Sequence, residues 1–424
     1  MGHKPLSPGD WSRRGLAVLV LFGVLLSAGC WDYREPDEVA WIMAIGVDKG
    51  RENLIRVSAQ IAIPKDIGAG GTGGGGGGGG SEAHFVVAMD APSIPVALEL
   101  MNAFVDRRAD LSHTKVVIFS RELAEEGLNR YFATLNRFYQ FRPTSSVLIS
   151  QDKAEETLRQ ANPILEDNPG KYWELITAGW QYTEFIPRAT FQIIDQAIRT
   201  PGGSAMIPLV GLEREEPGPP DRTFKPKGEQ IAGDVTRRGG VPVEFMGAAV
   251  FKAGRMVGAV NGDEVGVVKF VKGEIEETFE HIPDPCKRDK LIVVRIFPRQ
   301  RPEIEIDLRG TGPPRVMATV FLEGDIVSIQ GRTEYDEPEL ISVLEREVVK
   351  NRNEEAREAV ERAQELEADI FGFGWQAKKQ FLAWRDWEDY RWGEQFSHAD
   401  IEVTFDLKVR RVGLVHESPL FRPD

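Results

Sequence analysis

Apolar and polar residues alternate strictly near the carboxyl end of the chain, in the two-residue period typical of a β-strand. The alternating apolar residues are Ile401, Val403, Phe405, Leu407 and Val409, and charged or hydroxyl residues fill the positions between them. This pattern predicts a strand with one buried face and one solvated face. Residues 55–63 show the same alternation and residues 39–47 form a nearly continuous apolar run, so both segments are predicted strands.

The first half of the chain changes repeatedly between helical and strand periodicity after residue 94. The predicted elements are helix 94–107, strand 115–120, helix 122–139, strand 145–150, helix 152–161 and further helical material over 170–199. In the helix 122–139, aromatic and leucine side chains return every three or four residues and mark one buried face. This alternation of helices and strands predicts a mixed α/β layer.

The second half predicts a hairpin, further strands and one long helix. The hairpin joins 245–251 to 256–260 through a turn at Ala253 and Gly254. The later predicted strands are 290–297, 303–308, 316–322 and 326–330. A helix is predicted over 338–370, with an apolar stripe that is interrupted at Arg352, and we interpret its charged residues as a solvated face.

Composition divides the chain into segments. Proline, glycine and charged residues dominate 213–233, which predicts a linker, and a glycine tract from Gly68 to Gly80 predicts a flexible surface insertion. The predicted class is α+β, with three successive mixed α/β domains after a cleaved lipoprotein signal peptide. The predicted segments are the signal peptide 1–29, an N-terminal mixed α/β domain 30–212 with the flexible Gly-rich insertion 68–81, the linker 213–233, a small β-rich middle domain 234–285 and a C-terminal α/β domain 286–424.

The first 29 residues have the pattern of an export signal. Basic residues precede an apolar run over 15–26, which is too short for a membrane span of about 20 residues. Small residues follow and then Cys30, an arrangement that resembles a lipobox, although Ser27 stands where leucine is usual. We therefore expect diacylglycerol and an N-acyl lipid on Cys30, and anchoring on the extracytoplasmic face of a cell membrane. An ordinary cleaved signal with an unmodified cysteine is the alternative.

Charge and cysteine content narrow the class of protein further. The formal net charge of −14 on 424 residues argues against nucleic acid as a partner. The two cysteines are Cys30 and Cys286, so acylation of the first would leave the second without a partner for an intrachain disulfide.

The sequence contains no recognisable catalytic or metal-binding constellation. None of the six histidines belongs to a His-Glu-x-x-His helix. His281 and Cys286 are close in sequence, but two ligands do not make a metal site, and we expect a turn around Pro283 and Pro285 instead. Ser112 and Lys115 match the Ser-x-x-Lys pattern of penicillin-binding enzymes without its companion motifs. We predict no catalytic residue, no metal and no cofactor beyond the lipid.

Four of the nine tryptophans gather in one short stretch. They are Trp375, Trp384, Trp387 and Trp392. A sugar platform or an interfacial belt are alternatives, but the helical spacing of these and neighbouring apolar residues favours core packing. The preceding segment, Asp369–Gly374, is interpreted as the end of one helix and the start of another.

Several of these segments, in order, carry the motifs of a known family. They are Cys30–Glu35 running into Ala44–Lys49, His113–Lys115 with Glu122–Gly127, Gly247–Lys252 with Met256–Gly258, and Asp369–Gly374 with Trp384 and Trp387 before the last strand. Together they resemble the Ger(x)C family, the C-subunit lipoproteins of bacterial spore germinant receptors. The run Gly73–Gly80 departs from the family pattern.

The resemblance implies a non-catalytic, lipid-anchored subunit of a nutrient germinant receptor, needed for receptor assembly or signalling in spore germination. It implies a place on the outer face of the spore inner membrane, beside the membrane-embedded A and B subunits. Next to the anchor, Trp31, Asp32, Arg34 and Glu35 are candidates for membrane-proximal or subunit contacts. Local packing is the alternative role of these four residues.

Two other functions stay open on the sequence alone. A lipoprotein solute-binding component of a membrane transporter would need two lobes that close on a ligand cleft, and the sequential order of the predicted domains argues against it. A cell-envelope hydrolase would depend on Ser112 or Lys115.

Overall fold

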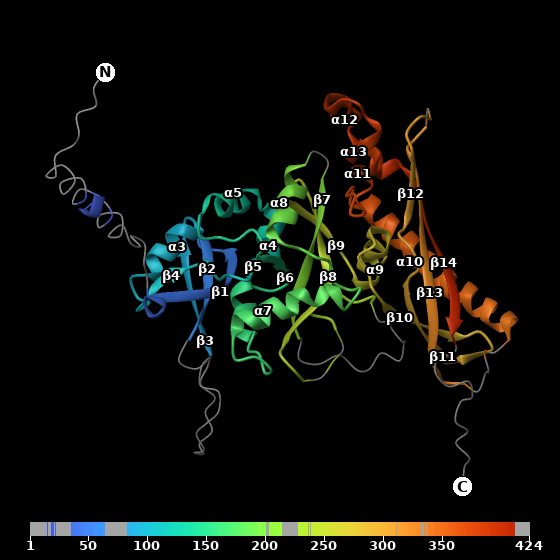
Figure 1. Cartoon of the computed structure of the whole chain (residues 1–424), viewed down its shortest axis with the longest axis horizontal. Coiled ribbons are helices and arrows are strands. Elements are labelled where there is room, and N and C mark those ends of the chain that lie inside the picture. The colour runs from blue at the N-terminus through green and yellow to red at the C-terminus, as the bar shows by residue number, and fades with distance from the viewer. Residues whose placement is uncertain are drawn as a thin grey trace, which may run out of the picture.

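Two β-sheets with helices packed against them form the chain, one in each half of the sequence (Figure 1). The computed structural model describes residues 15, 18–20, 22, 35–63, 83–200, 203–213, 228–235, 237, 239–310, 312–331, 335 and 337–411. Within these residues the first sheet has nine strands and the second has five. The fold is α+β, as the sequence predicts, and the two halves lie side by side along the long axis of the molecule (Figure 1).

The first sheet has parallel strands at its centre and antiparallel strands at both edges. Its order is β3-β2-β1-β5-β6-β7-β8-β9, with the short β4 paired to β1. The strands are β1 (Val39–Lys49), β2 (Ile55–Ala62), β3 (His84–Ala91), β4 (Arg108–Asp110), β5 (Val116–Ser120), β6 (Ser146–Ser150), β7 (Ser204–Leu212), β8 (Val243–Lys252) and β9 (Arg255–Val260). Parallel pairing joins β1, β5, β6 and β7. The central strands are almost wholly apolar because both of their faces are covered.

Helices cover the two faces of this sheet in separate layers. They are α3 (Ile94–Met101), α4 (Arg121–Glu126), α5 (Asn129–Arg137), α6 (Ala154–Gln160), α7 (Pro169–Thr177) and α8 (Phe191–Arg199), with short 3-10 turns η1 (Pro36–Glu38) and η2 (Ala178–Gln181). Val117 and Phe119 of β5 belong to the core with residues of α3, α4, α5 and α8. Val116 and Ile118, on the opposite face of the strand, pack with residues of α6 and α7.

The helix predicted over 122–139 is interrupted and forms α4 and α5. Gly127 has a φ of 117°, which no helix can continue through and which suits glycine. The Leu128 N–H then donates to the carbonyl of Gly254 (2.8 Å) in the turn of the β8–β9 hairpin. The prediction of one continuous helix is therefore wrong, because the Leu128 N–H donates to a distant turn and not to a carbonyl of the preceding helical turn.

The second sheet is built around one long strand. Its order is β10-β11-β13-β12, with β14 parallel to β13. The strands are β10 (Thr278–Asp284), β11 (Lys287–Pro298), β12 (Glu303–Asp307), β13 (Arg315–Ile329) and β14 (Asp400–Arg411). The strand predicted from strict alternation near the carboxyl end is confirmed as β14. β13 is continuous where two strands are predicted, because Gly324 pairs with β11 on one side and with β14 on the other.

Helices α9 and α10 occupy the junction between the two sheets. Helix α9 (Gly262–Lys272) starts with a capping box: Asn261 accepts from the Glu264 N–H (2.9 Å), and Glu264 accepts from the Asn261 N–H (2.7 Å). Helix α10 (Pro338–Glu365) packs on α9 and on β14. The remaining elements are α11 (Phe373–Ala377), η3 (Lys378–Gln380), α12 (Trp384–Tyr390), α13 (Trp392–Gln395) and η4 (Phe396–His398).

The segment 234–285, predicted as a middle domain, has no sheet of its own among the described residues. β8 and β9 complete the first sheet, α9 follows, and β10 begins the second sheet. The predicted linker 213–233 accordingly falls between β7 and β8, two strands that pair with each other. Its proline-rich composition is that of an insertion between paired strands, which sequence composition does not distinguish from a domain linker.

A buried guanidinium joins the two halves of the molecule. The side chain of Arg352 on α10 is fully buried, and its Nη2 pairs with Glu184 of the first half (3.3 Å) and with Glu280 of β10 (2.5 Å). Its Nη1 pairs with Glu355 (2.9 Å), and the guanidinium lies over the ring of Phe270. We call these residues the Arg352 cluster. The interpretation of the α10 charges as a solvated face is therefore wrong for Arg352 and Glu355.

A second buried cation fixes the same region of the first half. The ammonium of Lys269 on α9 donates to the carbonyls of Trp180 (2.7 Å) and Thr183. Burial lowers the pKa of Lys269 to about 8, and the charges of Glu274 and Glu184 oppose this shift. The short segment 180–184 is thus held by ionic and polar contacts from both α9 and α10.

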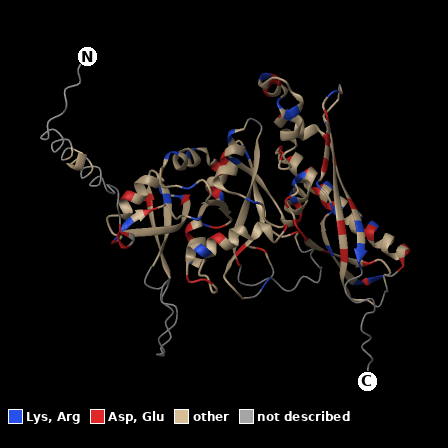
Figure 2. Ribbon diagram, viewed as in Figure 1, with Lys and Arg blue, Asp and Glu red and all other residues tan. Residues whose placement is uncertain are grey.

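We expect Arg352→Met to lower the free energy of unfolding by about 3–5 kcal/mol, because buried carboxylates would lose their counter-charge. Urea unfolding measures the loss. Acidic and basic residues are interspersed over both halves (Figure 2), so an exposed charged residue is available for comparison. Arg357→Met on the same helix is the matched control. Arg357 pairs with Glu361 (3.1 Å) at a side-chain exposure of 63%, so its loss should change stability by less than about 1 kcal/mol. Equal losses in both variants would contradict the cluster's role.

The same cluster predicts a pH dependence of stability. Burial raises the pKa of Glu355 from 4.5 to about 8, against the opposing charge of Arg352. Between these values the folded protein holds a proton that the unfolded chain has released, so stability falls as pH rises through this window. We expect a lower free energy of unfolding at about pH 9 than at about pH 5, and Glu355→Gln, which cannot ionise, should have a flatter profile. An unchanged profile in Glu355→Gln would show that another group titrates.

Candidate functional site

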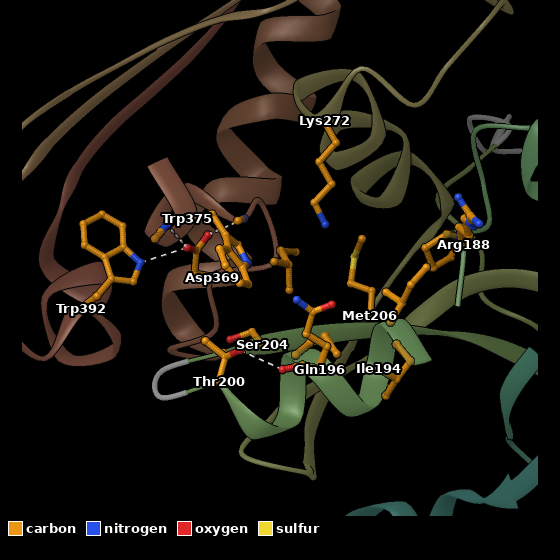
Figure 3. A pocket seen from close by; sticks show the side chains of 18 of the residues that line it. Arg188, Ile194, Gln196, Thr200, Ser204, Met206, Lys272, Asp369, Trp375 and Trp392 are labelled. Atoms are coloured by element: carbon orange, nitrogen blue, oxygen red, sulfur yellow. Dashed lines mark hydrogen bonds between the residues drawn. The ribbon is translucent and has the colours of Figure 1, made fainter. Parts of the chain in front are cut away.

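A cavity of about 510 Å³ lies where the two halves of the molecule meet (Figure 3). Ile194 and Thr200 of the α8 region and Met206 of β7 form one wall, and the turn 369–375 forms the other. The end of α9 contributes Lys272. The volume falls in the range of about 300–1,000 Å³ that is usual for small-molecule sites.

One carboxylate builds the turn that forms the second wall. Asp369 Oδ1 accepts from the N–H groups of Gly372 (2.8 Å) and Phe373 (3.1 Å), and Oδ2 accepts from the Gly374 N–H (2.6 Å) and from Trp392 Nε1 (2.9 Å). Burial raises the pKa of Asp369, and these hydrogen bonds oppose the rise. The predicted helix stop and helix start are confirmed, since α10 ends before this turn and α11 begins within it. Both oxygens of Asp369 are therefore engaged in holding the turn.

The tryptophan cluster is divided between core and surface. Trp387 and Trp392 are buried and stack at 6.3 Å, so core packing is confirmed for them. Trp375 and Trp384 are half exposed, and for these two the core prediction is wrong. The ammonium of Lys378 lies over both exposed rings, 4.0 Å from the Trp384 centroid. The helical spacing of this stretch indicated burial without showing which tryptophans the body of the protein would cover.

Two cationic side chains from different segments line the cavity. Lys272 extends into it from the last turn of α9 (Figure 3), and no described group forms a hydrogen bond or ion pair with its ammonium. The enclosing protein lowers the pKa of Lys272, while Glu274 and Asp369 oppose the shift. Arg188 lines the opposite side, with its guanidinium over the Trp180 ring.

No sequence pattern marks Lys272 or Arg188 as a cavity residue. Lys272 ends α9, a helix that lies between the predicted elements, and Arg188 lies in the non-helical stretch between η2 and α8. The glycine after Lys272 is a recognisable helix end. The surroundings of that helix end depend on packing between distant segments. Local sequence patterns do not predict such packing.

The segment Ala44–Lys49, part of the first motif that resembles the family, positions a helix. Asp48, at the end of β1, accepts from the N–H groups of Ala154 (2.7 Å) and Glu155 (2.9 Å) at the start of α6. Burial raises the pKa of Asp48, and these two hydrogen bonds oppose it. A Cβ on Gly46 would lie 3.1 Å from Ala154, so glycine lets the helix approach the strand closely. This motif acts as a docking site for α6.

The Ser-x-x-Lys residues have separate partners. Ser112 Oγ lies 3.0 Å from Nδ1 of its neighbour His113, while the Lys115 ammonium pairs with Glu174 of α7 (3.0 Å). Lys115 leads directly into β5, so the pair is not on a helix. Ser112 and Lys115 therefore do not form the helical serine–lysine pair that the hydrolase interpretation requires.

Most of the sequence-predicted contact residues lie outside the described residues. These are Cys30, Trp31, Asp32 and Arg34. Glu35 is described; it is exposed, and its carbonyl accepts from the Glu38 N–H (3.1 Å) at the start of η1. The structure therefore places Glu35 on the surface at the entry to β1.

His281 and Cys286 belong to different parts of a hairpin. His281 lies in β10, which continues through Pro283, and Cys286 follows in the turn as an exposed free thiol. The described part of the chain contains no group of three His, Cys, Asp or Glu residues placed to hold a metal. No helix in that part is long and apolar enough to cross a membrane.

Two family models match the chain in succession. "Spore germination protein N-terminal domain" matches residues 32–212, and "Spore germination B3/ GerAC like, C-terminal" matches residues 246–413. Together they cover most of the chain and define a spore germination protein. The chain belongs to the Ger(x)C family, the family of germinant-receptor C subunits.

Curated relatives match over almost their full length. Spore germination protein KC of Bacillus subtilis (strain 168) is 26% identical over 94% of this chain and 96% of its own. Spore germination protein GerQC of Bacillus cereus is 20% identical over 95% of this chain and 99% of its own. The crystal structure of the GerBC protein aligns with a TM-score of 0.47 at 15% identity, covering 86% of this chain and 96% of that one.

We expect Gly374→Ala to destabilise the cavity wall, because its Cβ would lie 2.7 Å from Trp392 and 3.2 Å from Asp369 Oδ2. Overpacking of this kind costs about 1–3 kcal/mol, and thermal unfolding measures it. Gly312→Ala is the control, since a Cβ there meets no atom within 4 Å, and its effect should stay within about 0.5 kcal/mol. A Gly374→Ala protein as stable as the control would show that the turn can relax freely.

Proposed function

We propose that this protein is a non-catalytic, lipid-anchored subunit of a nutrient germinant receptor, needed for receptor assembly or signalling in spore germination. The observation that carries the proposal is the start of the family match at residue 32, directly after the lipobox-like Cys30. The matched domain thus begins where the expected anchor ends. Membership of the germinant-receptor C family supports the receptor role.

The proposed anchor is diacylglycerol with an N-acyl lipid on Cys30. Each buried CH₂ contributes about 0.8 kcal/mol, so long acyl chains hold a protein far more firmly than a single myristoyl group. The protein would stand on the extracytoplasmic face of the spore inner membrane. Glu35 and the preceding Trp31, Asp32 and Arg34 would then lie beside the lipid surface.

The proposed partners are the membrane-embedded A and B receptor subunits. Confinement to one membrane raises the effective concentration of each partner, so modest contacts suffice to hold a complex. No catalytic role is assigned: Ser112 and Lys115, the residues on which a hydrolase would depend, pair with His113 and Glu174 instead. Within the described ranges the chain passes once from the first sheet to the second, unlike a two-lobed solute-binding protein whose chain crosses repeatedly.

We expect Cys30→Ala to fold normally but to be lost from the spore inner membrane, because the thiol that would carry the lipid is absent. Fractionation of spores, with mass spectrometry of the N-terminal residue in the wild-type protein, measures anchoring. Nutrient germination should fall with it. Cys286→Ala is the control, because Cys286 is an exposed free thiol far along the chain.

Membrane retention and normal germination in Cys30→Ala would contradict the proposal. So would an unacylated N-terminal residue in the wild-type protein. Loss of germination in Cys286→Ala to the same degree would assign the defect to a thiol effect that does not depend on anchoring.

A further inference from the structure

The cavity between the two halves contains a cation that forms no hydrogen bond or ion pair with a described residue. Lys272 is exposed to the cavity rather than packed in the core, and its ammonium forms no ion pair or hydrogen bond with a described residue. By contrast, two buried cations of the junction do have such partners: Lys269 donates to backbone carbonyls, and Arg352 pairs with carboxylates. A lysine ammonium that lines a cavity without a bonded partner is free to pair with a bound anion.

The acidic residues on the cavity wall do not fill this role. Asp369 uses both oxygens to hold the turn 372–374 and Trp392. Glu274 lines the cavity and its charge acts on Lys272, but the two side chains form no hydrogen bond or ion pair among the described contacts. Arg188 and Lys378 add further positive charge to the walls, which leaves the lining with three cations against two carboxylates.

The rest of the wall is apolar. Ile193, Ile194, Met206, Ile370 and Trp375 line it. Figure 3 shows Lys272 directed between Met206 on one side and Trp375 on the other. A ligand that satisfies both parts of the lining needs one anionic head and an apolar body.

The helix ends restrict the charge of that head. Both α8 and α9 have their carboxyl ends at the cavity, where Thr200 and Lys272 line it. Helix carboxyl ends carry a partial negative charge, so they oppose a dianion such as phosphate. A single carboxylate, which a lysine ammonium can bind by a charge-assisted hydrogen bond, suits this field better.

We propose that the cavity between α8, α9 and the turn 369–375 is a binding site for a small monocarboxylate with an apolar or aromatic body, whose carboxylate pairs with Lys272. This goes beyond the proposed receptor role and does not depend on it. The ligand would contact both halves of the protein at once, so its binding would favour one arrangement of the two sheets.

Isothermal titration calorimetry on the full chain in a non-ionic detergent tests the proposal with three probes that share one aromatic body. Phenylacetate is anionic, phenethyl alcohol is neutral and phenethylamine is cationic. We expect saturable binding of phenylacetate, weaker binding of the alcohol and none of the amine. Inorganic phosphate should not compete. Equal binding of all three aromatic probes, or no saturable binding of phenylacetate, would overturn the proposal.

Two variants test the two parts of the site separately. Lys272→Gln should weaken phenylacetate binding by about ten- to a hundredfold, the usual worth of a hydrogen bond to a charged group, while Lys272→Arg should retain it. Ile193→Trp, at a residue 39% exposed on the cavity wall, should block the apolar space while the charge stays. Lys290→Gln, outside the cavity lining, is the charge-matched control.

Thermal unfolding of each unliganded variant checks that the fold is intact. Because Lys272 has no bonded partner to lose, its replacement should leave the midpoint unchanged. Phenylacetate should raise the midpoint of the wild-type protein and of Lys290→Gln, as a ligand of the folded state must, but not that of Lys272→Gln. Unweakened binding by Lys272→Gln would assign the ligand to another place and overturn the site.

Discussion

The arrangement of the two sheets depends on the burial of one guanidinium. Arg352 lies on a helix of the second half, and its partner Glu184 belongs to the first half, so this ion pair forms only when the halves dock. Glu280 and Glu355 complete the cluster from β10 and from the same helix. A buried charge is tolerated only when it is paired. The cluster therefore favours one docked arrangement over any in which the halves separate.

This docking also forms the cavity. Helix α9 is tied to the first half through Lys269 and the carbonyl of Trp180, and the same helix ends at Lys272 on the cavity wall. The opposite wall follows α10, the helix that carries Arg352, and is shaped by Asp369. Both walls thus adjoin helices that carry the buried cations of the junction. The cavity is a property of the docked pair of sheets and belongs to neither half alone.

Local periodicity predicted the elements of this fold well and their long-range contacts poorly. The alternation at 401–409 and the hairpin at 245–260 are confirmed as β14 and as β8–β9. The interruption at Arg352 was visible in the sequence, but its partner Glu184 lies 168 residues away, so the charge was interpreted as solvated. The cavity escaped prediction for the same reason, because Lys272 and Ile194 meet only through packing between the halves.

The residues that carry the family resemblance are engaged in building the fold. Asp48 holds the start of α6, and Thr114 Oγ1 donates to the carbonyl of Ile42 (3.0 Å) between neighbouring strands. A Cβ on Gly247 would lie 2.4 Å from a carbonyl oxygen of β9, and Asp369 closes a turn with four hydrogen bonds. Such motifs identify the family through its architecture. Residues that contact lipid, ligand or partner subunits must therefore be sought where these motifs leave side chains free, as in the cavity and among the exposed aromatic side chains around α12.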